Sequence, residues 1–131
     1  MKFNLFNGYA LYDTTFWLYF DYTRNNLAKT LNIQHAYKDC FLSDKAETLV
    51  PTLVSGVYAN KFPGKGRTVW TFFNGNFVTV NQSVIALDYQ TGDKFFDVWN
   101  KSEIKPVIKD GKAYIRLRLD PHDVGCIVRS R

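Results

Sequence analysis

The sequence predicts a mainly β protein, an antiparallel β-sandwich of about seven strands preceded by one or two short α-helices. From residue 57 onward, short runs rich in Val, Ile, Phe, Tyr and Trp alternate with turn residues. Before residue 57, apolar residues recur instead at spacings of three and four, as on one side of a helix. The chain has 131 residues, of which 46% are hydrophobic, so it fits one domain with a buried core, or one domain with a short appendage.

The predicted helical region covers residues 16–38. The Asp-Thr-Thr sequence at 13–15 supplies candidate N-caps, and Asn32 is a candidate end for the first helical piece. A second, shorter piece is expected within residues 33–42. One side of the first piece is strongly aromatic, so we expect it to pack on the sandwich or on a second copy of the chain, forming a homodimer through residues 16–31. The residues at helical spacing on this side are Phe16, Tyr19, Phe20, Thr23, Leu27 and Leu31.

Residues 42–56 are predicted to connect the helices to the sandwich. Pro51 restricts the residue before it to extended conformations, and Gly56 permits a turn. The expected division is therefore a helical N-terminal segment with its linker, residues 1–56, followed by an antiparallel sandwich, residues 57–131.

Turn residues separate the predicted strands of the sandwich. The clearest turn is the Asp110-Gly111 pair, which tolerates the positive φ angles of a type I′ hairpin. In the strand after it, residues 113–119 alternate between apolar side chains and Tyr or Arg, so one face should be buried and the other wet. The predicted strands are residues 57–62, 67–73, 77–89, 94–99, 103–109, 112–119 and 123–129. The inward residues of the last two are expected to include Ile115, Leu117, Ile127 and Val128.

The charge pattern indicates neither a nucleic-acid partner nor a membrane partner. The net charge is +5, from 17 basic and 12 acidic residues, and the charges are scattered along the chain. No stretch approaches the roughly 20 apolar residues of a membrane span. The densest basic cluster fits a solvated strand face better than a phosphate-binding patch. It consists of Arg116, Arg118, Arg129 and Arg131.

The cysteines and histidines give no sign of a metal site. Cys40 and Cys126 lie among apolar neighbours, which is typical of buried free thiols, with a single disulfide as the alternative. His35 and His122 are not spaced with the cysteines as zinc ligands are. The sequence therefore predicts no metal and no cofactor.

Pairs of carboxylates are candidate catalytic groups, because two acids can hydrolyse a glycosidic bond. The candidates here lie in turns and at strand ends, where carboxylates usually accept hydrogen bonds from local backbone amides. His122 has aspartates on either side of it, but no nucleophile motif accompanies it. The sequence therefore predicts no catalytic residue. The carboxylates considered are Asp88, Asp93, Asp97, Asp120 and Asp123.

The aromatic residues of the second half are the candidate ligand contacts. Exposed flat rings stack on pyranose rings or on bases, whereas buried rings contribute to a core or a domain interface. Within residues 69–73 both alternating sets are apolar, so this strand is either covered on both faces or exposes some of its rings. The candidates for glycan contact are Trp70, Phe72 and Trp99.

The second half also resembles a known kind of domain. The strand VWTFFNGN (69–76), the long segment 84–128, the strand end Asp-Val-Trp-Asn (97–100) and the final strand from Leu119 to Ile127 carry the resemblance. They are similar to the C-terminal β-sandwich that follows the catalytic (β/α)₈ barrel in glycoside hydrolases of the α-amylase and α-galactosidase type. The front part resembles the tail of such a barrel and its linker.

This resemblance implies that the catalytic carboxylates belong to an upstream barrel of the same parent chain, which would be the main partner of this domain. The expected function is then that of a non-catalytic accessory domain that stabilises the barrel and helps position glycan. One alternative is a stand-alone carbohydrate-binding module, in which a patch of rings holds an oligosaccharide or polysaccharide. Another is a small nucleic-acid-binding β-barrel, which predicts steeply salt-dependent binding and is disfavoured by the scattered charges.

Overall fold

The computed structural model describes residues 2–8 and 21–131 of the chain. Over these residues it is a β-sandwich with three helices on one side, so the predicted fold class is confirmed. The helices are α1 (Lys2–Asn7), α2 (Asp21–Ala36) and α3 (Lys38–Phe41). The strands are β1 (Glu47–Val50), β2 (Val57–Pro63), β3 (Arg67–Asn74), β4 (Val80–Asp88), β5 (Lys94–Asp97), β6 (Ser102–Ile104), β7 (Val107–Lys109), β8 (Lys112–Leu119) and β9 (Val124–Ser130).

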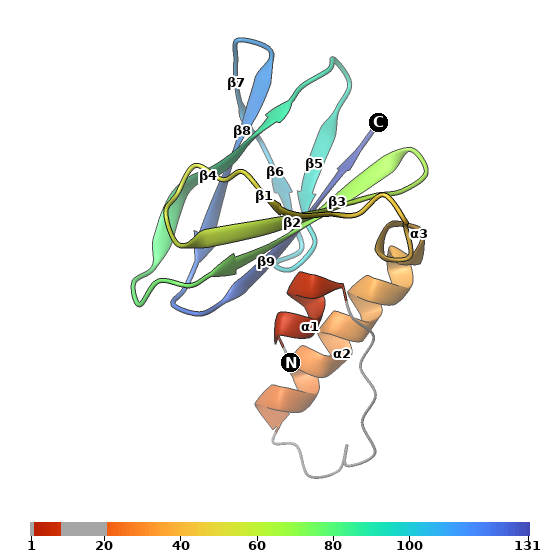
Figure 1. Cartoon of the computed structure of the whole chain (residues 1–131), viewed down its shortest axis with the longest axis vertical. Coiled ribbons are helices and arrows are strands. Elements are labelled where there is room, and N and C mark those ends of the chain that lie inside the picture. Colours follow the sequence, from red (N-terminus) through yellow and green to blue (C-terminus); the bar gives the residue numbers. More distant parts are fainter. Residues whose placement is uncertain (1, 9–20) are drawn as a thin grey trace.

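Two antiparallel sheets form the sandwich. The larger sheet has six strands in the order β1-β2-β3-β9-β5-β6, and the smaller has three in the order β4-β8-β7. Their facing sides enclose one apolar core, to which β3 contributes Trp70 and Phe72, β8 contributes Ile115 and Leu117, and β9 contributes Ile127. Figure 1 shows α1, α2 and α3 gathered against the larger sheet, on the side away from β4, β7 and β8.

The helices create a second apolar layer on the outer face of the larger sheet. Leu5, Phe6, Ile33 and Cys40 come from the helices, and they pack on residues of β2, β3 and β9. The central strand β3 is therefore covered on both faces, which explains why both alternating sets of residues 69–73 are apolar. Helices α1 and α3 pack on the sandwich. The expectation itself concerned residues 16–31, and it stays a prediction because the aromatic residues Phe16, Tyr19 and Phe20 lie outside the described residues. Pairing of residues 16–31 with a second copy stays a prediction.

The predicted inward residues and the predicted hairpin are confirmed. The hairpin between β7 and β8 turns at Asp110 and Gly111, whose φ angles are +51° and +72°. Along β8, buried and more exposed residues alternate as the sequence predicts. The exposed fractions of Ile115, Leu117, Ile127 and Val128 are 0%, 5%, 0% and 6%.

The strand count is higher than predicted, for two reasons. The connector contains the edge strand β1, whose residues are mostly exposed and whose register with β2 is irregular, so it shows no alternation. The run predicted at 103–109 is interrupted at Pro106, which has no backbone N–H to donate, and becomes β6 and β7. In addition, β4 begins only at Val80, and Phe77 before it is exposed.

The helices also differ from the prediction. Helix α2 does not end at Asn32 but continues to Ala36, and α1 was not predicted at all. Leu27 is buried as expected, whereas Leu31 is 42% exposed and Ile33 takes the buried position instead. The predicted N-caps at 13–15 and the aromatic residues Phe16, Tyr19 and Phe20 lie outside the described residues, as does the side chain of Thr23.

Candidate functional site

The clearest polar arrangement of the molecule joins the helices to the larger sheet. It begins at the end of α1, where the last carbonyl groups of a helix have no partner within the helix. The carbonyl oxygen of Phe6 accepts hydrogen bonds from Asn60 Nδ2 at 2.9 Å and from Thr71 Oγ1 at 2.5 Å. Asn60 Oδ1 in turn accepts a hydrogen bond from the backbone of Leu49 in β1, at 2.8 Å. Buried side chains of β2 and β3 thus hold α1 and the edge strand in place.

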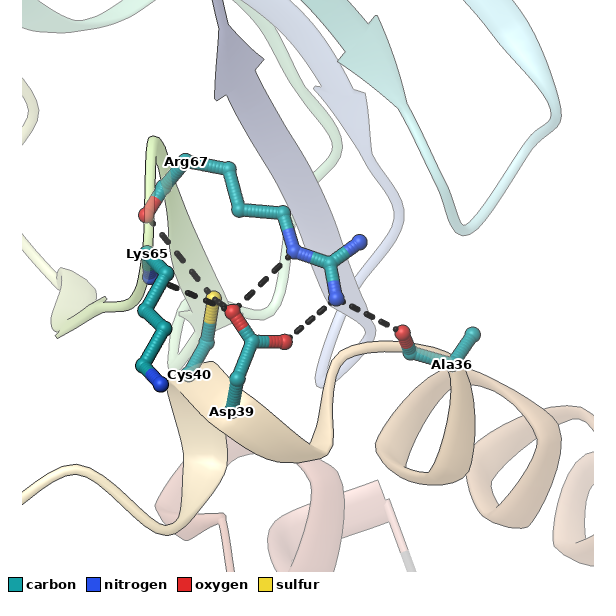
Figure 2. A network of polar contacts seen from close by, with 5 residues as sticks. All are labelled: Ala36, Asp39, Cys40, Lys65 and Arg67. Carbon is teal, nitrogen blue, oxygen red and sulfur yellow. Dashed lines mark hydrogen bonds and ion pairs between the residues drawn. The ribbon is translucent and has the colours of Figure 1, made fainter.

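A second attachment joins α3 to the turn between β2 and β3 (Figure 2). Arg67, the first residue of β3, donates from Nε to Asp39 Oδ2 at 3.2 Å and from Nη2 to Asp39 Oδ1. Its Nη2 also donates to the carbonyl oxygen of Ala36 at 3.0 Å, at the end of α2. The backbone N–H of Lys65 adds a bond to Asp39 Oδ2 at 3.3 Å, and the guanidinium lies 4.7 Å from the ring centroid of Tyr37. We call this set, Ala36, Tyr37, Asp39, Lys65 and Arg67, the clasp.

The electrostatics of the clasp follow from this bidentate pairing. The hydrogen bonds from Arg67 lower the pKa of Asp39 from 3.8 to about 2, and the same pair raises the pKa of Arg67. Both groups are therefore charged across the physiological pH range. The clasp therefore attaches the end of α2 and helix α3 to the turn between β2 and β3, and so positions these helices on the sheet.

The two cysteines lie close to this junction and are free. Burial is the main cause that raises the pKa of Cys40 to about 11, and it also raises the pKa of Cys126. The thiolate is the reactive form of cysteine, so thiols with raised pKa values are poor nucleophiles near neutral pH. Both side chains belong to the apolar layer between the helices and the larger sheet.

The three rings predicted to contact glycan are buried. Trp70 and Phe72 are 2% and 0% exposed and belong to the core between the sheets. Trp99 is 6% exposed, belongs to the helix-side layer, and has Lys29 Nζ 4.0 Å above its ring centroid. The structure therefore separates Trp99 from the other two, and burial favours packing as their role. Contact of these rings with glycan stays a prediction.

The carboxylates considered in the sequence are engaged in local structure. Asp97 is buried and accepts from the backbone N–H and the Nδ2 of Asn100, both at 2.9 Å. Asp120 accepts from Thr79 Oγ1 at 3.2 Å and from Arg118 at 3.3 Å. These two line a cleft of about 500 Å³ near the open edge of the sandwich, together with Glu103 and other charged residues. The remaining pairs are Asp88 with Lys112 and Asp93 with Arg131.

Sequence reasoning missed a groove between α2 and the turn that follows β5. Its volume is about 680 Å³. One wall is formed by α2 and by Tyr37, which lies between α2 and α3. The other wall is formed by the end of β5 and the residues that follow it. No local pattern could have indicated this groove, because its walls are some 60 or more residues apart in the chain. It is lined by Asn25, Ala28, Lys29, Asn32, Ile33, Ala36, Tyr37, Phe96, Val98, Trp99, Asn100 and Lys101.

The described part of the chain contains neither a group of metal ligands nor a membrane-spanning helix. Over residues 2–8 and 21–131, no three or more His, Cys, Asp or Glu side chains are grouped so that they could hold a metal ion. In the same part of the chain, no helix has both the length and the apolar character needed to cross a membrane.

Solved structures of several longer proteins contain a part with a similar fold. A Bacillus halodurans C-125 protein proposed to be an alpha-N-acetylgalactosaminidase superposes with a TM-score of 0.65 at 14% identity, over 99% of this chain and 29% of its own. An Anoxybacillus alpha-amylase gives a TM-score of 0.60 at 14% identity, over 87% of this chain and 24% of its own. A Bacteroides fragilis NCTC 9343 protein proposed to be an alpha-galactosidase gives 0.57 at 15% identity, over 86% and 23%.

These likenesses concern the fold alone, because the sequence identities are only 14–15%. The chain spans between about a fifth and a third of the length of each of these structures. The fold is thus a β-sandwich with attached helices that matches one part of each of these longer structures. No protein-family model matches the sequence, and no curated protein matches it.

Proposed function

We propose that this chain is a non-catalytic accessory β-sandwich of a carbohydrate-processing glycoside hydrolase. In this role it stabilises the catalytic (β/α)₈ barrel of its parent and helps position glycan. The observation that carries the proposal is the likeness to glycoside hydrolases in which the matching part is a small share of a longer chain. The helices are included in the match with the highest TM-score of the three, since it extends over 99% of this chain.

The junction of the helices with the larger sheet supports the same role. An accessory domain must be held at a fixed orientation by the segment that connects it to its catalytic partner. Here that segment is fixed at two places, the carbonyl of Phe6 and the clasp, and by the apolar layer between them. A sandwich joined rigidly to helices can transmit stability to whatever those helices pack against.

The first test asks whether the chain is catalytic by itself. The purified 131-residue chain should release no nitrophenol from aryl glycosides and should not shorten oligosaccharides. Turnover that disappears in Asp97→Asn or Asp120→Asn would overturn the non-catalytic assignment. Lys112→Gln, at an exposed pair away from the cleft, is the matched control.

The second test concerns the barrel. The gene that encodes this sandwich should also encode a (β/α)₈ barrel in the same protein. That protein should need the sandwich for its full thermal stability. Deleting the sandwich from that protein should lower its melting temperature by several degrees or more. The absence of a barrel from the gene and from the proteins that copurify with the chain would refute the accessory role.

A further inference from the structure

We propose that the groove between α2 and the turn after β5 binds an acidic saccharide, namely a pyranose unit that carries a carboxylate. The inference rests on the proposed function, which assigns the domain to carbohydrate processing, and it names a ligand class and a location for it. Four features of the groove carry the inference: its amides, its rings, its charge and the way its turn is held.

The first feature is the set of amide side chains. Asn25 and Asn32 project from α2, and Asn100 faces them from the turn after β5. An amide offers a donor and an acceptor in one plane, and neighbouring hydroxyl groups of a sugar need both. All three asparagines are exposed on the protein surface. One N–H of the Asn100 amide is used by Asp97, which leaves its Oδ1 and second N–H for a ligand.

The second feature is the aromatic surface between these amides. Phe96 is 40% exposed, and it lines the groove with the partly buried Tyr37. The apolar face of a pyranose ring packs on such rings, which explains why sugar sites combine aromatic and amide side chains. Trp99 forms part of the floor under Lys29 and supports this surface from below.

The third feature is the charge of the lining. The groove is lined by Lys29 and Lys101 and, among the residues the structure describes, by no Asp or Glu. The cleft near Asp97 differs in this respect, since four carboxylates and three basic side chains line it together. Lys101 is exposed at this groove and no described residue of its lining is acidic, so a uronate fits the groove better than a neutral sugar does.

The fourth feature is the conformation of the turn that supplies Asn100 and Lys101. Asp97 holds Asn100 through two hydrogen bonds of 2.9 Å, one to the backbone and one to the side-chain amide. Lys101 has a φ of +56°, in the left-handed region that costs a non-glycine residue free energy. A turn fixed in this way presents Lys101 to the groove in a set direction, and such pre-organisation lowers the entropic cost of binding a ligand.

The test is a titration of the ¹⁵N-labelled full chain with trigalacturonate, followed by NMR, with maltotriose as the neutral comparison. Trigalacturonate should shift the amide signals of Asn100 and Lys101 and of the facing turns of α2, and maltotriose should bind several-fold more weakly. Lys101→Gln should weaken the binding of trigalacturonate about 3- to 10-fold, which corresponds to one partly solvated charged contact. Phe96→Ala should weaken both saccharides.

Lys94→Gln is the matched control, because Lys94 is also exposed and lies in β5 but does not line the groove. Phe77→Ala is the control for the ring, since Phe77 is 86% exposed and lies outside the groove. Melting curves of all variants verify that each remains folded.

Three results would overturn the proposal: no shift with trigalacturonate, equal affinity for maltotriose, or equal losses in Lys94→Gln and Lys101→Gln. The outcome is separable from that of the proposed function. If the parent protein contains a barrel but the groove binds no saccharide, only the assignment of the groove is refuted. Saccharide binding without any barrel would keep the groove and replace the accessory role by that of a carbohydrate-binding module.

Discussion

Removal of the Arg67 guanidinium should destabilise the attachment of α3 to the sheet by an amount that depends on pH. In Arg67→Gln the two hydrogen bonds to Asp39 and the bond to the carbonyl oxygen of Ala36 are lost or weakened. The magnitude follows from the pKa of Asp39, which the pair lowers from 3.8 to about 2. Each pKa unit is worth about 1.4 kcal/mol, which sets an upper bound of roughly 2.5 kcal/mol.

Solvent reduces this bound. The side chains of Asp39 and Arg67 are 26% and 34% exposed, so water screens part of their interaction. We therefore expect Arg67→Gln to lower the free energy of unfolding by about 1–2 kcal/mol at pH 7. Urea denaturation followed by tryptophan fluorescence measures this difference.

The pH dependence has a definite sign. The pKa of Asp39 is lower in the folded state than in the unfolded state, so its contribution is fully present above about pH 4 and is lost as the pH falls through about 2. The difference between wild type and Arg67→Gln should therefore shrink toward pH 2, leaving mainly the contribution of the bond to Ala36. Arg116→Gln, which removes exposed contacts to Asn81, is the matched control and should cost less. A loss below about 0.3 kcal/mol at pH 7, or a difference that is the same at pH 2 and pH 7, would refute the reasoning.

Three further outcomes can be checked on the same chain. Ile115→Ala or Leu117→Ala should cost about 2–5 kcal/mol in urea denaturation, since both side chains are buried between the sheets, and losses below about 0.5 kcal/mol at both sites would contradict this. Cys40 and Cys126 should react with a thiol reagent at pH 7.5 only after unfolding, because burial raises both pKa values; rapid labelling of the folded chain would show that the layer opens. Gly111→Ala should cost about 1 kcal/mol, because its φ of +72° disfavours a side chain even though the surrounding space is open; an unchanged melting temperature would argue against the predicted turn.

The sandwich was predictable from sequence wherever burial alternates along a strand. The strand β8 shows this alternation, and so its inward face could be assigned before the structure was known. The edge strand β1 has no such pattern, because its residues are mostly exposed and its register is interrupted. A short apolar run predicts a strand but does not indicate which sheet or helix covers it. The sequence alone therefore does not decide whether Trp70, Phe72 and Trp99 are buried or exposed, and the structure shows them buried.

The packing of the helical segment and the candidate site could not be predicted, because both depend on contacts between residues far apart in the sequence. Helix α1 has six residues, too few to be stable alone, and it is held by partners from the sheet rather than by its own sequence. Asp39 and Arg67 are 28 residues apart, and nothing in either neighbourhood indicates that they pair. The groove likewise joins α2 to a turn near residue 100, and its charge balance appears only when both walls are known.

The attachment of α1 determines which substitutions positions 6 and 60 can tolerate. Every residue type has a backbone carbonyl, so the acceptor at position 6 survives any substitution there, and only the packing of the ring constrains Phe6. The donors are side chains, and Asn60 donates to α1 and accepts from Leu49 through one short amide. Gln carries the same amide on a side chain one methylene longer, which would displace it from this buried position. Asn60→Asp would place a carboxylate against a carbonyl oxygen in a site that is 2% exposed. In a library of variants, position 60 should tolerate almost no replacement, while position 6 should accept other apolar residues of similar size.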